Sequence, residues 1–389
     1  MPERPPDFLN YDEVRAAARR RLPRGVFEYI DRGTESEQAL RENRDALDRI
    51  RLVPRGLVDV SAISQGVTLL GQPRPSPLVI APTAMAGLVW HDGEVELARA
   101  AAAHGIPFCV STQSITAIER IAESKATLWF QLYVWKERAR TWCLVERALA
   151  AGAEALVLTI DTPVVPKRDY NIRNGYGIPV RPSLKAGLDV LSHPAWLWQV
   201  LLKYLRTTGL PSYAHYPDEF RTELGRVAVG DEVSLAANLT WDDLRELRRR
   251  WPAQLIVKGI LSVEDAKLAA DFGADGIIVS NHGARNLDCA PGPTDMLPAI
   301  LETLGARITV LADSGVRRGS DVAKFMALGA HGVLTGRAPL WGLAAGGSEG
   351  ARHMLDILGV ELGTTMAFLG ATTIDDLRRL QRMDRRAEC

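Results

Sequence analysis

Short apolar runs that end in polar or glycine-rich residues recur along the chain from residue 78 onward. Eight such runs are present: Leu78–Thr83, Ile106–Ser111, Leu128–Val134, Ala155–Asp161, Leu255–Ile260, Gly276–Asn281, Ile308–Asp313 and Gly332–Gly336. Stretches with helical periodicity separate most of them, such as Gly93–His104, Arg138–Ala151, Val263–Phe272 and Ser320–Leu328. Continuous apolar strands that alternate with helices predict an α/β fold with a parallel sheet buried on both faces. Eight units favour a closed (β/α)8 TIM barrel over an open sheet.

The first 60 residues predict an N-terminal helical segment. Asp12 is expected to cap a basic amphipathic helix that continues to Arg21. A second helical turn is expected over Gly25–Ile30, and a charged helix over Glu37–Ile50. We expect the whole chain, residues 1–389, to form a single barrel domain that begins with this helical segment.

One connection, between the fourth and fifth strands, is much longer than the others. About ninety residues separate these two runs, whereas most connections in compact domains are short. We expect an insertion over residues 177–240. It contains the sequence PAWLWQVLLKYL, Pro194–Leu205, whose composition suits a helix that lies in a bilayer interface but is too short to span it. An oligomer contact or a lid over the barrel mouth are the alternatives.

Composition and charge narrow the function classes. Forty-seven basic residues balance forty-seven acidic ones, which argues against a dedicated nucleic-acid-binding protein. Four cysteines are far apart and form no CxxC pair, so we expect no metal site, no disulfide framework and a reducing compartment; they are Cys109, Cys143, Cys289 and Cys389. The N-terminus has no apolar signal-peptide core and no apolar run is long enough to span a bilayer. These features predict a cytoplasmic protein, at most peripheral on the inner face of the membrane.

The candidate chemistry lies at the ends of the predicted strands, because a barrel of this kind builds its active site from the C-terminal strand ends. Each end has an ordinary explanation on its own, but eight polar ends together predict an active site. They are Pro82–Leu88, Ser111–Gln113, Gln131–Tyr133, Thr159–Asp169, Lys258–Gly259, Ser280–Cys289, Asp313–Asp321 and Thr335–Ala338.

The last two strand ends predict a phosphate site. Gly315–Gly319 leads into a helix near Ser320, and Gly336 and Arg337 lead into another segment. Main-chain N–H groups at such helix starts, together with Arg317 and Arg337, form a cradle for a phosphate group. Loops after strands seven and eight are the usual phosphate site in barrels. A phosphorylated cofactor or substrate is therefore expected, and the lack of an early GxGxxG argues against a Rossmann dinucleotide site.

The ordered motifs PTAM, QLY, TIDTP with a following Arg, VKG, SNHGARNLD and DSGVRRGSD resemble those of the FMN-dependent 2-hydroxy acid oxidase and dehydrogenase family. The likeness extends from Phe27 to Gly350. Within the family, the chain looks most like the bacterial (S)-mandelate dehydrogenases, which also carry a membrane-associating insert between the fourth and fifth strands. The resemblance implies an enzyme that binds FMN, oxidises an (S)-2-hydroxy acid to the 2-oxo acid and forms a homotetramer.

The resemblance also implies the catalytic residues. His282 would be the general base or accept the hydroxyl proton, and Asp161 would pair with it, raise its pKa and stabilise the imidazolium. Arg168 and Arg285 would bind the substrate carboxylate, a task that suits guanidinium groups. Tyr29 and Tyr133 would hydrogen-bond the carboxylate and the hydroxyl. The same residues serve whether the α-hydrogen leaves as a proton or as a hydride.

The implied cofactor contacts involve a larger set. Lys258 would sit at flavin N1/O2, where positive charge stabilises the reduced anion. The pyrimidine edge would contact Ser111, Gln131 and Thr159, and N5 would face the backbone of Pro82, Thr83 and Ala84. Asp313 would bind the ribityl chain. The remaining cofactor-binding residues would be Ser280, with Gly315, Arg317, Gly336 and Arg337 at the phosphate.

Three positions depart from the common pattern. Ala284 replaces the second glycine of the family's HGGR and could displace Arg285. Ala84 matches the oxidases, whereas mandelate dehydrogenases tend to have glycine, so the electron acceptor could be O2, a quinone or another carrier. Gln113 replaces a bulky aromatic residue in the pocket wall and, with Val165 nearby, favours an aryl substrate such as mandelate over lactate or glycolate.

Two further readings stay open at this stage. The first is a specialised relative that acts on a peptide-derived substrate, as the mycofactocin-maturation flavoenzymes do. Those proteins lose the second substrate arginine, whereas this chain keeps Arg285. The second is a flavin-binding barrel without enzymatic activity, and the retention of His282, Asp161 and both arginines argues against it.

Overall fold

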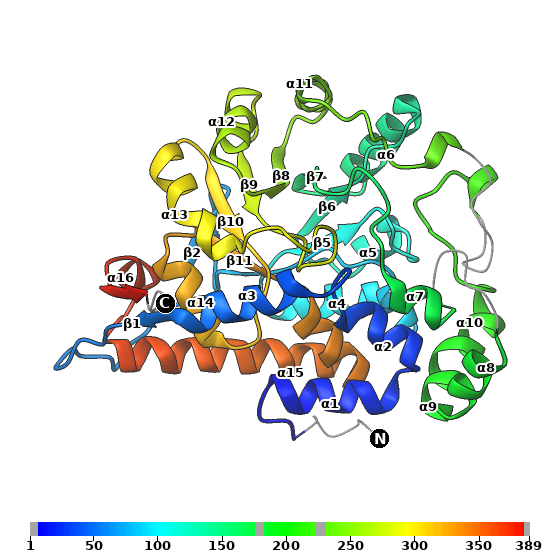
Figure 1. Ribbon diagram of the computed structural model, residues 1–389, viewed down its shortest axis with the longest axis horizontal. Coiled ribbons are helices and arrows are strands. Elements are labelled where there is room, and N and C mark those ends of the chain that lie inside the picture. The colour runs from blue at the N-terminus through cyan, green and yellow to red at the C-terminus, as the bar shows by residue number, and fades with distance from the viewer. Residues whose placement is uncertain (1–6, 176–182, 222–230, 385–389) are drawn as a thin grey trace.

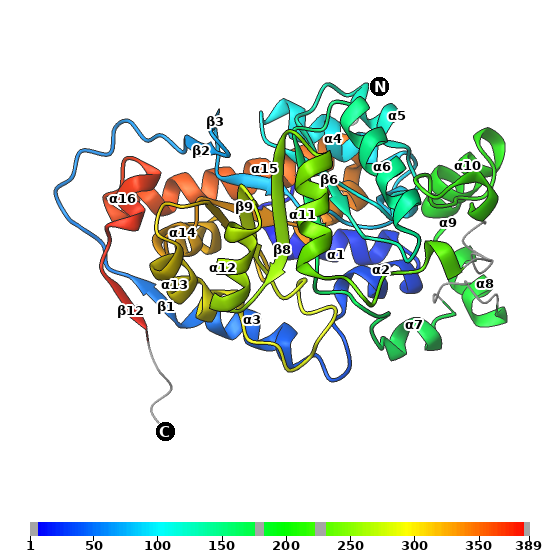
Figure 2. The ribbon, with the colours of Figure 1, turned by 90° about the horizontal axis from the view of Figure 1, so that it is seen from above.

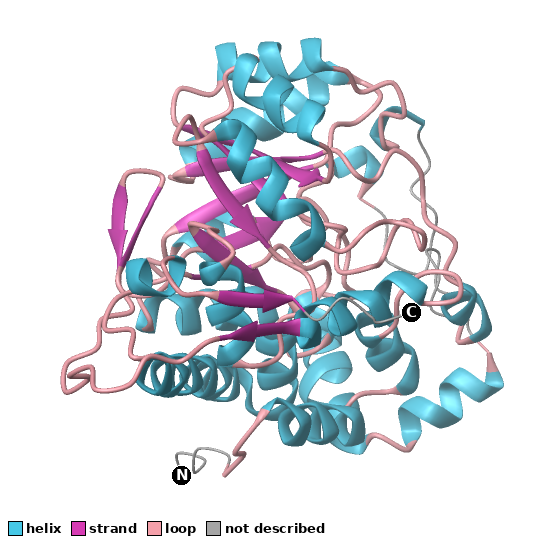
Figure 3. Ribbon diagram, turned by 60° about the vertical axis from the view of Figure 1, so that its left-hand side comes forward, coloured by secondary structure: helices cyan, strands magenta, loops and turns pink. Residues whose placement is uncertain are grey.

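The chain folds into a closed barrel of parallel strands surrounded by helices (Figure 1; Figure 3). The computed structural model describes residues 7–175, 183–221 and 231–384. The barrel strands are β4 (Leu78–Ile80), β5 (Phe108–Ser111), β6 (Leu128–Leu132), β7 (Ala155–Thr159), β8 (Gln254–Ile260), β9 (Gly276–Val279), β10 (Thr309–Ala312) and β11 (Gly332–Thr335). They pair in chain order, and β11 pairs with β4 to close the barrel. The predicted (β/α)8 barrel is confirmed.

The barrel interior is filled by alternate side chains of the strands. Cys109, Trp129 and Ile256 belong to one buried apolar cluster inside the barrel. A hairpin of β2 (Val67–Leu69) and β3 (Gln72–Arg74) contributes Leu69 and Leu70 to the same cluster. This hairpin, which the sequence analysis did not predict, therefore packs against the barrel interior.

Helices pack around the barrel and at its ends. They are α1 (Tyr11–Arg21), α2 (Arg24–Asp31), α3 (Gln38–Arg49), η1 (Ala86–Leu88), α4 (Gly93–Ala103), α5 (Ile118–Ala122), α6 (Arg138–Ala150), α11 (Trp241–Arg250), α12 (Val263–Asp271), α13 (Pro293–Leu304), α14 (Gly319–Ala327), α15 (Arg337–Leu369) and α16 (Ile374–Arg378). The four barrel helices predicted from periodicity are confirmed to within a residue or two. Helix α15 consists of two helices joined by a kink at Gly346 and Gly347, whose backbone angles are not helical.

The N-terminal helices differ from the prediction in two details. Asn10, not Asp12, caps α1, because its side chain accepts hydrogen bonds from the N–H groups of Asp12 and Glu13. The third helix ends one residue early, since Ile50 starts the short strand β1 (Ile50–Leu52). This strand pairs antiparallel with β12 (Arg382–Asp384) near the other end of the chain.

The connection between β7 and β8 contains additional helices: α7 (Asp169–Arg173), α8 (Leu184–Leu191), α9 (Pro194–Trp196), η2 (Leu197–Leu201), α10 (Leu202–Thr207), η3 (Asp218–Phe220) and η4 (Asp231–Val233). Of the predicted insertion, residues 177–182 and 222–230 lie outside the described residues, as do 1–6 and 385–389 of the predicted domain, Cys389 included. Helices α8, α9 and α10 lie together at one end of the molecule (Figure 2).

The predicted helix over Pro194–Leu205 is present, with one π-helical turn in its middle. Its inner face is buried, and the indole Nε1 of Trp196 donates to the Leu88 carbonyl at 2.7 Å. On its outer face, the side chains of Trp198 and Leu205 are 57% and 50% exposed. Among the described residues, no helix has the length and apolar character needed to cross a bilayer.

Candidate active site

A cavity lies at the C-terminal ends of the barrel strands and is covered by the N-terminal helices. Nearly all of the predicted site residues line it: Tyr29, Pro82, Thr83, Ala84, Ser111, Gln131, Tyr133, Thr159, Arg168, Lys258, His282, Arg285, Asp313, Gly315, Arg317, Gly336 and Arg337. The other two do not line the cavity but hydrogen-bond residues that do: Asp161 bonds to His282, and Ser280 bonds to Lys258. The structure thus brings the predicted residues together in one place.

His282 and Asp161 form a hydrogen-bonded pair beside this cavity. The His282 Nδ1 lies 2.8 Å from the Asp161 Oδ1. The loop after β9 holds His282 in a left-handed backbone conformation, and its main-chain N–H donates to the Ser280 Oγ at 3.0 Å. With Nδ1–H donating to the carboxylate, Nε2 carries the lone pair that can accept a proton.

Two residues that the sequence analysis did not identify hold the Asp161 carboxylate. The Asn286 side-chain amide donates to the Asp161 main-chain carbonyl at 2.9 Å and to the carboxylate Oδ1 at 3.3 Å, and the Thr162 hydroxyl donates to the same Oδ1 at 3.1 Å. Both positions follow motif residues in the sequence, but neither has a side chain whose type alone indicates this task. They fix the carboxylate that in turn orients His282.

The pKa of His282 is lowered overall, although Asp161 raises it as predicted. Burial is the largest cause, and the nearby positive charges of Lys258 and Arg168 add to it; the Asp161 carboxylate opposes them without reversing the net effect. Burial alone would raise the pKa of Asp161, but His282 and Lys258 lower it to about 2. At neutral pH the pair is therefore a neutral imidazole beside a carboxylate, which is the form a general base requires.

Two guanidinium groups lie near His282. Nη2 of Arg168 donates to the Arg285 carbonyl at 2.9 Å, and Nη1 of Arg285 donates to the Tyr29 and Arg32 carbonyls at 2.6 and 3.1 Å. Burial and the charge of Arg285 lower the pKa of Arg168. No carboxylate in the described part of the chain pairs with either group. Two cations held by main-chain carbonyls make a site for an anion such as a carboxylate.

Lys258 is a buried cation on the strand facing His282. Its Nζ donates to the Ser280 Oγ at 2.8 Å and lies 3.2 Å from the Asp313 Oδ2. Burial would lower the pKa of Lys258, but Asp313 and Asp161 outweigh it and raise that pKa, so the ammonium is charged. Gly259 follows in a left-handed conformation, and a Cβ there would lie 2.6 Å from the Asp161 Cβ. The glycine of the VKG motif is thus needed for Asp161 to approach this strand.

Several buried polar atoms around the cavity lack a partner among the described residues. They are the Gln131 Nε2, the hydroxyls of Thr83, Thr159 and Thr335, and the Asp161 Oδ2. Buried polar atoms in native proteins are nearly always hydrogen-bonded. Since all of these residues except Asp161 line the cavity, the pattern fits a bound molecule with several acceptor and donor atoms, such as the heterocycle and side chain of a flavin.

The predicted phosphate cradle is only partly available. The N–H groups of Arg317 and Arg318 at the start of α14 donate to the Asp321 carboxylate, and that of Gly319 donates to Glu361. Helix α15 has no side-chain cap at its start, and Gly336 and Arg337 line the cavity there. The free helix start for an anion is therefore that of α15 rather than α14.

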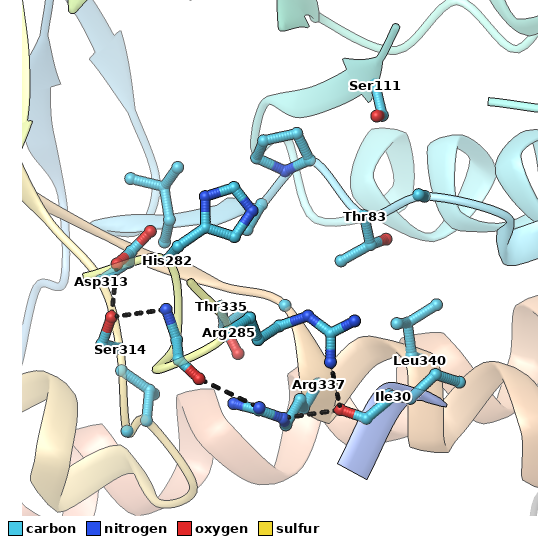
Figure 4. A pocket seen from close by; sticks show the side chains of 18 of the residues that line it. Ile30, Thr83, Ser111, His282, Arg285, Asp313, Ser314, Thr335, Arg337 and Leu340 are labelled. Atoms are coloured by element: carbon cyan, nitrogen blue, oxygen red, sulfur yellow. Dashed lines mark hydrogen bonds between the residues drawn. The ribbon is translucent and has the colours of Figure 1, made fainter. Parts of the chain in front are cut away.

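Arg337 and Arg285 both donate hydrogen bonds to main-chain carbonyls at the C-terminal end of α2 (Figure 4). The Arg337 Nε donates to the Ile30 carbonyl at 2.9 Å, and its Nη2 donates to the Gly283 carbonyl at 3.0 Å. Burial and the charge of Arg285 lower the pKa of Arg337 to about 10. A helix C-terminus favours cations, so α2 holds both guanidinium groups at the cavity wall.

Ala284 occupies a left-handed backbone conformation and is fully buried. Its methyl group does not release Arg285, whose guanidinium donates to the main-chain carbonyls of Tyr29, Ile30 and Arg32 at the end of α2. Because this anchor does not involve the methyl group, we expect Ala284→Gly to change kcat/KM by no more than about twofold, or roughly 0.4 kcal/mol in activation free energy. Steady-state kinetics checks this, and a gain well above that range would show that the methyl displaces Arg285.

Comparisons with known proteins agree with this site. A model of a family described as FMN-dependent dehydrogenase matches residues 18–382. An L-lactate dehydrogenase of Caulobacter vibrioides is 41% identical over 372 residues, covering 93% of this chain and 94% of that protein. An (S)-mandelate dehydrogenase of Pseudomonas putida is 40% identical over 372 residues, covering 95% and 93%.

Solved structures give the same result. A crystal structure described as the monotopic membrane protein (S)-mandelate dehydrogenase is 40% identical, with a TM-score of 0.91, over 97% of this chain and 100% of that one. A mandelate oxidase with benzoyl-formic acid is 33% identical, with a TM-score of 0.81, over 97% and 98%.

Proposed function

Because the chain belongs to the FMN-dependent dehydrogenase family and is an FMN-dependent 2-hydroxy acid dehydrogenase, we propose that its substrate is an aryl (S)-2-hydroxy acid such as (S)-mandelate. The product is the corresponding 2-oxo acid. The observation that supports oxidation of a 2-hydroxy acid is the neutral imidazole of His282, placed between the Asp161 carboxylate and a cavity with two cations, Arg168 and Arg285.

The residues around the cavity have the chemistry that FMN requires. When bound, FMN supplies the acceptor for the two electrons that leave the substrate. Lys258 would hold the pyrimidine ring at N1/O2, and the ribityl chain would contact Asp313. The start of α15 would bind the phosphate. The other proposed contacts are Pro82, Thr83, Ala84, Ser111, Gln131, Thr159, Ser280, Gly315, Arg317, Gly336 and Arg337.

The protein side chains bind, orient and deprotonate the substrate. Arg168 and Arg285 would bind the carboxylate by charge-assisted hydrogen bonds. Tyr29 and Tyr133 would hydrogen-bond the carboxylate and the hydroxyl, and His282 Nε2 would take a proton. That proton is the hydroxyl proton if the α-hydrogen leaves as a hydride, and the α-proton in the alternative route. Asp161 would stabilise the resulting imidazolium in both cases.

The aryl preference is supported by Gln113, which lines the cavity. Val165, which the sequence analysis placed nearby, is 85% exposed and does not line it. The proposal for the substrate side chain thus rests on Gln113. Relatives named for lactate and for mandelate are equally similar in sequence, and the structural neighbours add weight to mandelate.

Anaerobic mixing with substrate tests the proposed function. We expect (S)-mandelate to bleach the visible absorbance of bound FMN faster than L-lactate does. (R)-Mandelate is the matched control and is expected to leave the absorbance unchanged. Faster bleaching by L-lactate would overturn the aryl preference. Rapid return of the colour in air would identify O2 as the acceptor, and slow return would favour a quinone or another carrier.

We also propose that the protein binds peripherally to the inner face of the cytoplasmic membrane through the outer face of α9–α10. The exposed side chains of Trp198 and Leu205 support this, as do Leu184, Leu188 and Leu191 on α8. Lys203 and Arg206 on the same segment suit anionic headgroups. The electron acceptor would then be a membrane quinone.

Flotation with vesicles that contain phosphatidylglycerol tests the membrane proposal. Trp198→Asp is expected to reduce vesicle binding by about tenfold or more, because a buried large apolar side chain contributes roughly 1.5–3 kcal/mol. The matched control is Leu57→Asp, in an exposed loop between β1 and β2 at the opposite end of the molecule from α10 (Figure 2). Equal loss of binding in both variants, or in neither, would contradict this proposal.

A further inference from the structure

His215 is a buried histidine that belongs to the long connection between β7 and β8. The residue is only 2% exposed. Its ring packs edge-on against Phe130 of β6, with 5.2 Å between the ring centroids. It does not line the active-site cavity. Its role must therefore be exerted through the groups that it contacts.

Both ring nitrogens of His215 bind the main chain of the loop after β5. The Nε2 accepts from the Ile118 N–H at 3.0 Å, and the Nδ1 donates to the carbonyls of Ser111 and Thr112 at 3.1 and 3.3 Å. Accepting at Nε2 requires the neutral ring with its proton on Nδ1. Burial lowers the pKa of His215 to about 4, in agreement with that neutral form.

The preceding residue strengthens the same attachment. The Ala214 N–H donates to the Ser114 carbonyl at 3.0 Å. Residues 214 and 215 thus bind the loop at both ends and in the middle, over positions 111–118. An apolar replacement of His215 would take away its hydrogen bonds to the buried Thr112 carbonyl and Ile118 N–H, whereas the Ser111 carbonyl would keep the Ser114 N–H at 3.0 Å.

The other side of this loop forms the wall of the active site. The Thr112 Oγ1 donates to the Gln131 carbonyl at 2.7 Å and accepts from the Tyr133 N–H at 3.0 Å. The Ser111 Oγ donates to the Gln131 Oε1 at 3.2 Å and accepts from the Gln113 N–H at 3.1 Å. Ser111, Gln113, Gln131 and Tyr133 all line the cavity, and Figure 4 shows Ser111 at its wall, across from His282.

We propose that His215 is a positioning residue of the active site, which fixes Ser111 and Gln131 for the flavin and Tyr133 for the substrate through the loop after β5. The proposal rests on the proposed function for the identity of the ligands. It gives the long connection a second task besides membrane contact, because one of its residues sets the geometry of the barrel mouth. His215 touches no reacting atom and transfers no proton.

Variants of His215 test the proposal in the purified holoenzyme. His215→Phe keeps the ring but removes the three hydrogen bonds, whereas His215→Asn keeps a donor near the Nδ1 position. The matched control is His331→Phe. That half-buried histidine also accepts a main-chain N–H, from Val310 at 2.9 Å, but it lies just before β11, at the opposite end of that strand from Thr335.

Three readouts separate positioning from a structural role: the dissociation constant of FMN, the visible spectrum of bound FMN, and kcat and KM measured separately. His215→Phe is expected to weaken FMN binding by about tenfold or more, because the three hydrogen bonds that fix the loop carrying Ser111 are lost. The flavin spectrum is expected to shift and kcat to fall. His215→Asn is expected to recover part of each effect, and His331→Phe to lower only the melting temperature.

A His215→Phe variant that melts earlier but keeps wild-type FMN affinity, spectrum, kcat and KM would overturn the proposal. If His215→Phe does not fold, His215→Asn decides by the same readouts. FMN affinity and the flavin spectrum require no substrate. A wild-type enzyme that fails to oxidise mandelate would therefore contradict the proposed substrate, and leave the test of His215 intact.

Discussion

Replacing His282 with asparagine is expected to lower kcat/KM by about 10⁴-fold, the size of effect seen when a general base is removed. Asparagine keeps polarity beside Asp161 but has no lone pair of comparable basicity. Most of the proposed flavin contacts come from other strands, so FMN is expected to stay bound. Anaerobic bleaching of the flavin by (S)-mandelate measures the loss directly.

The control is His104→Asn. This partly exposed histidine pairs with Asp356 at 2.9 Å, away from the cavity, and its loss is expected to leave the rate unchanged. A His282→Asn enzyme whose flavin bleaches within about tenfold of the wild-type rate would contradict the assignment of His282 as the base, because general-base catalysis contributes a factor of roughly 10²–10⁴ to the rate.

The pH dependence follows from the lowered pKa of His282. The neutral base predominates above that pKa, so kcat/KM is expected to stay level through neutral pH and to fall only on the acid side of the ordinary value of 6.5. Asp161→Asn removes the group that raises this pKa, so the acid limb is expected to move to lower pH while kcat falls.

The free energy of unfolding is also expected to decrease as the pH falls. The folded state binds fewer protons than the unfolded state at His282, so stability is lost as pH falls from 6.5 to the folded pKa. Asp161 contributes stability above its ordinary value of 3.8, which is lost as pH falls to about 2.

Replacing Lys258 with methionine is expected to lower the free energy of unfolding by about 3–5 kcal/mol, because one partner of a buried ion pair is removed. The Asp313 carboxylate would lose its cationic partner and retain the hydrogen bond that the Ser314 hydroxyl donates to it at 2.8 Å. FMN affinity is expected to fall as well, because in the proposed site the Lys258 ammonium binds the flavin at N1/O2. Chemical denaturation and the visible spectrum measure the two effects.

The double variant Lys258→Met with Asp313→Leu separates charge from packing. It removes both charges, so most of the lost stability is expected to return while FMN binding does not. A single Lys258→Met variant as stable as the wild type would show that the ion pair is not needed. A double variant that binds FMN normally would contradict the assignment of both residues to the cofactor.

The barrel, and the gathering of the candidate site residues at one end of it, could be predicted because their signals are local. A strand buried on both faces is a continuous apolar run, and a polar residue near its C-terminal end stands out, as Lys258 does within β8 and Asp313 does directly after β10. The pairing of β1 with β12 joins residues at opposite ends of the chain, so no local pattern indicates it. The same holds for His215, which contacts a loop about a hundred positions earlier.

The errors in the site have a common physical cause. The sign of the pKa shift at His282 depends on how much burial outweighs Asp161, and the depth of burial is not encoded locally. The start of α14 has the glycines of an anion site, but the carboxylates of Asp321 and Glu361 accept hydrogen bonds from its N–H groups. Glu361 lies on α15, far along the chain from α14, so its contact with the start of α14 is evident only from the folded structure.

The last turn of α2 has a consequence for mutational tolerance. It holds Arg285 and Arg337 through main-chain carbonyls, at residues 29, 30 and 32, and a carbonyl is the same whichever side chain its residue carries. Substitutions of the Arg32 side chain therefore leave this anchor in place. A one-residue insertion or deletion in α2 would rotate the carbonyls by about 100° and release both guanidinium groups together. Sequences that share this anchor can vary in composition here but must keep the length of α2.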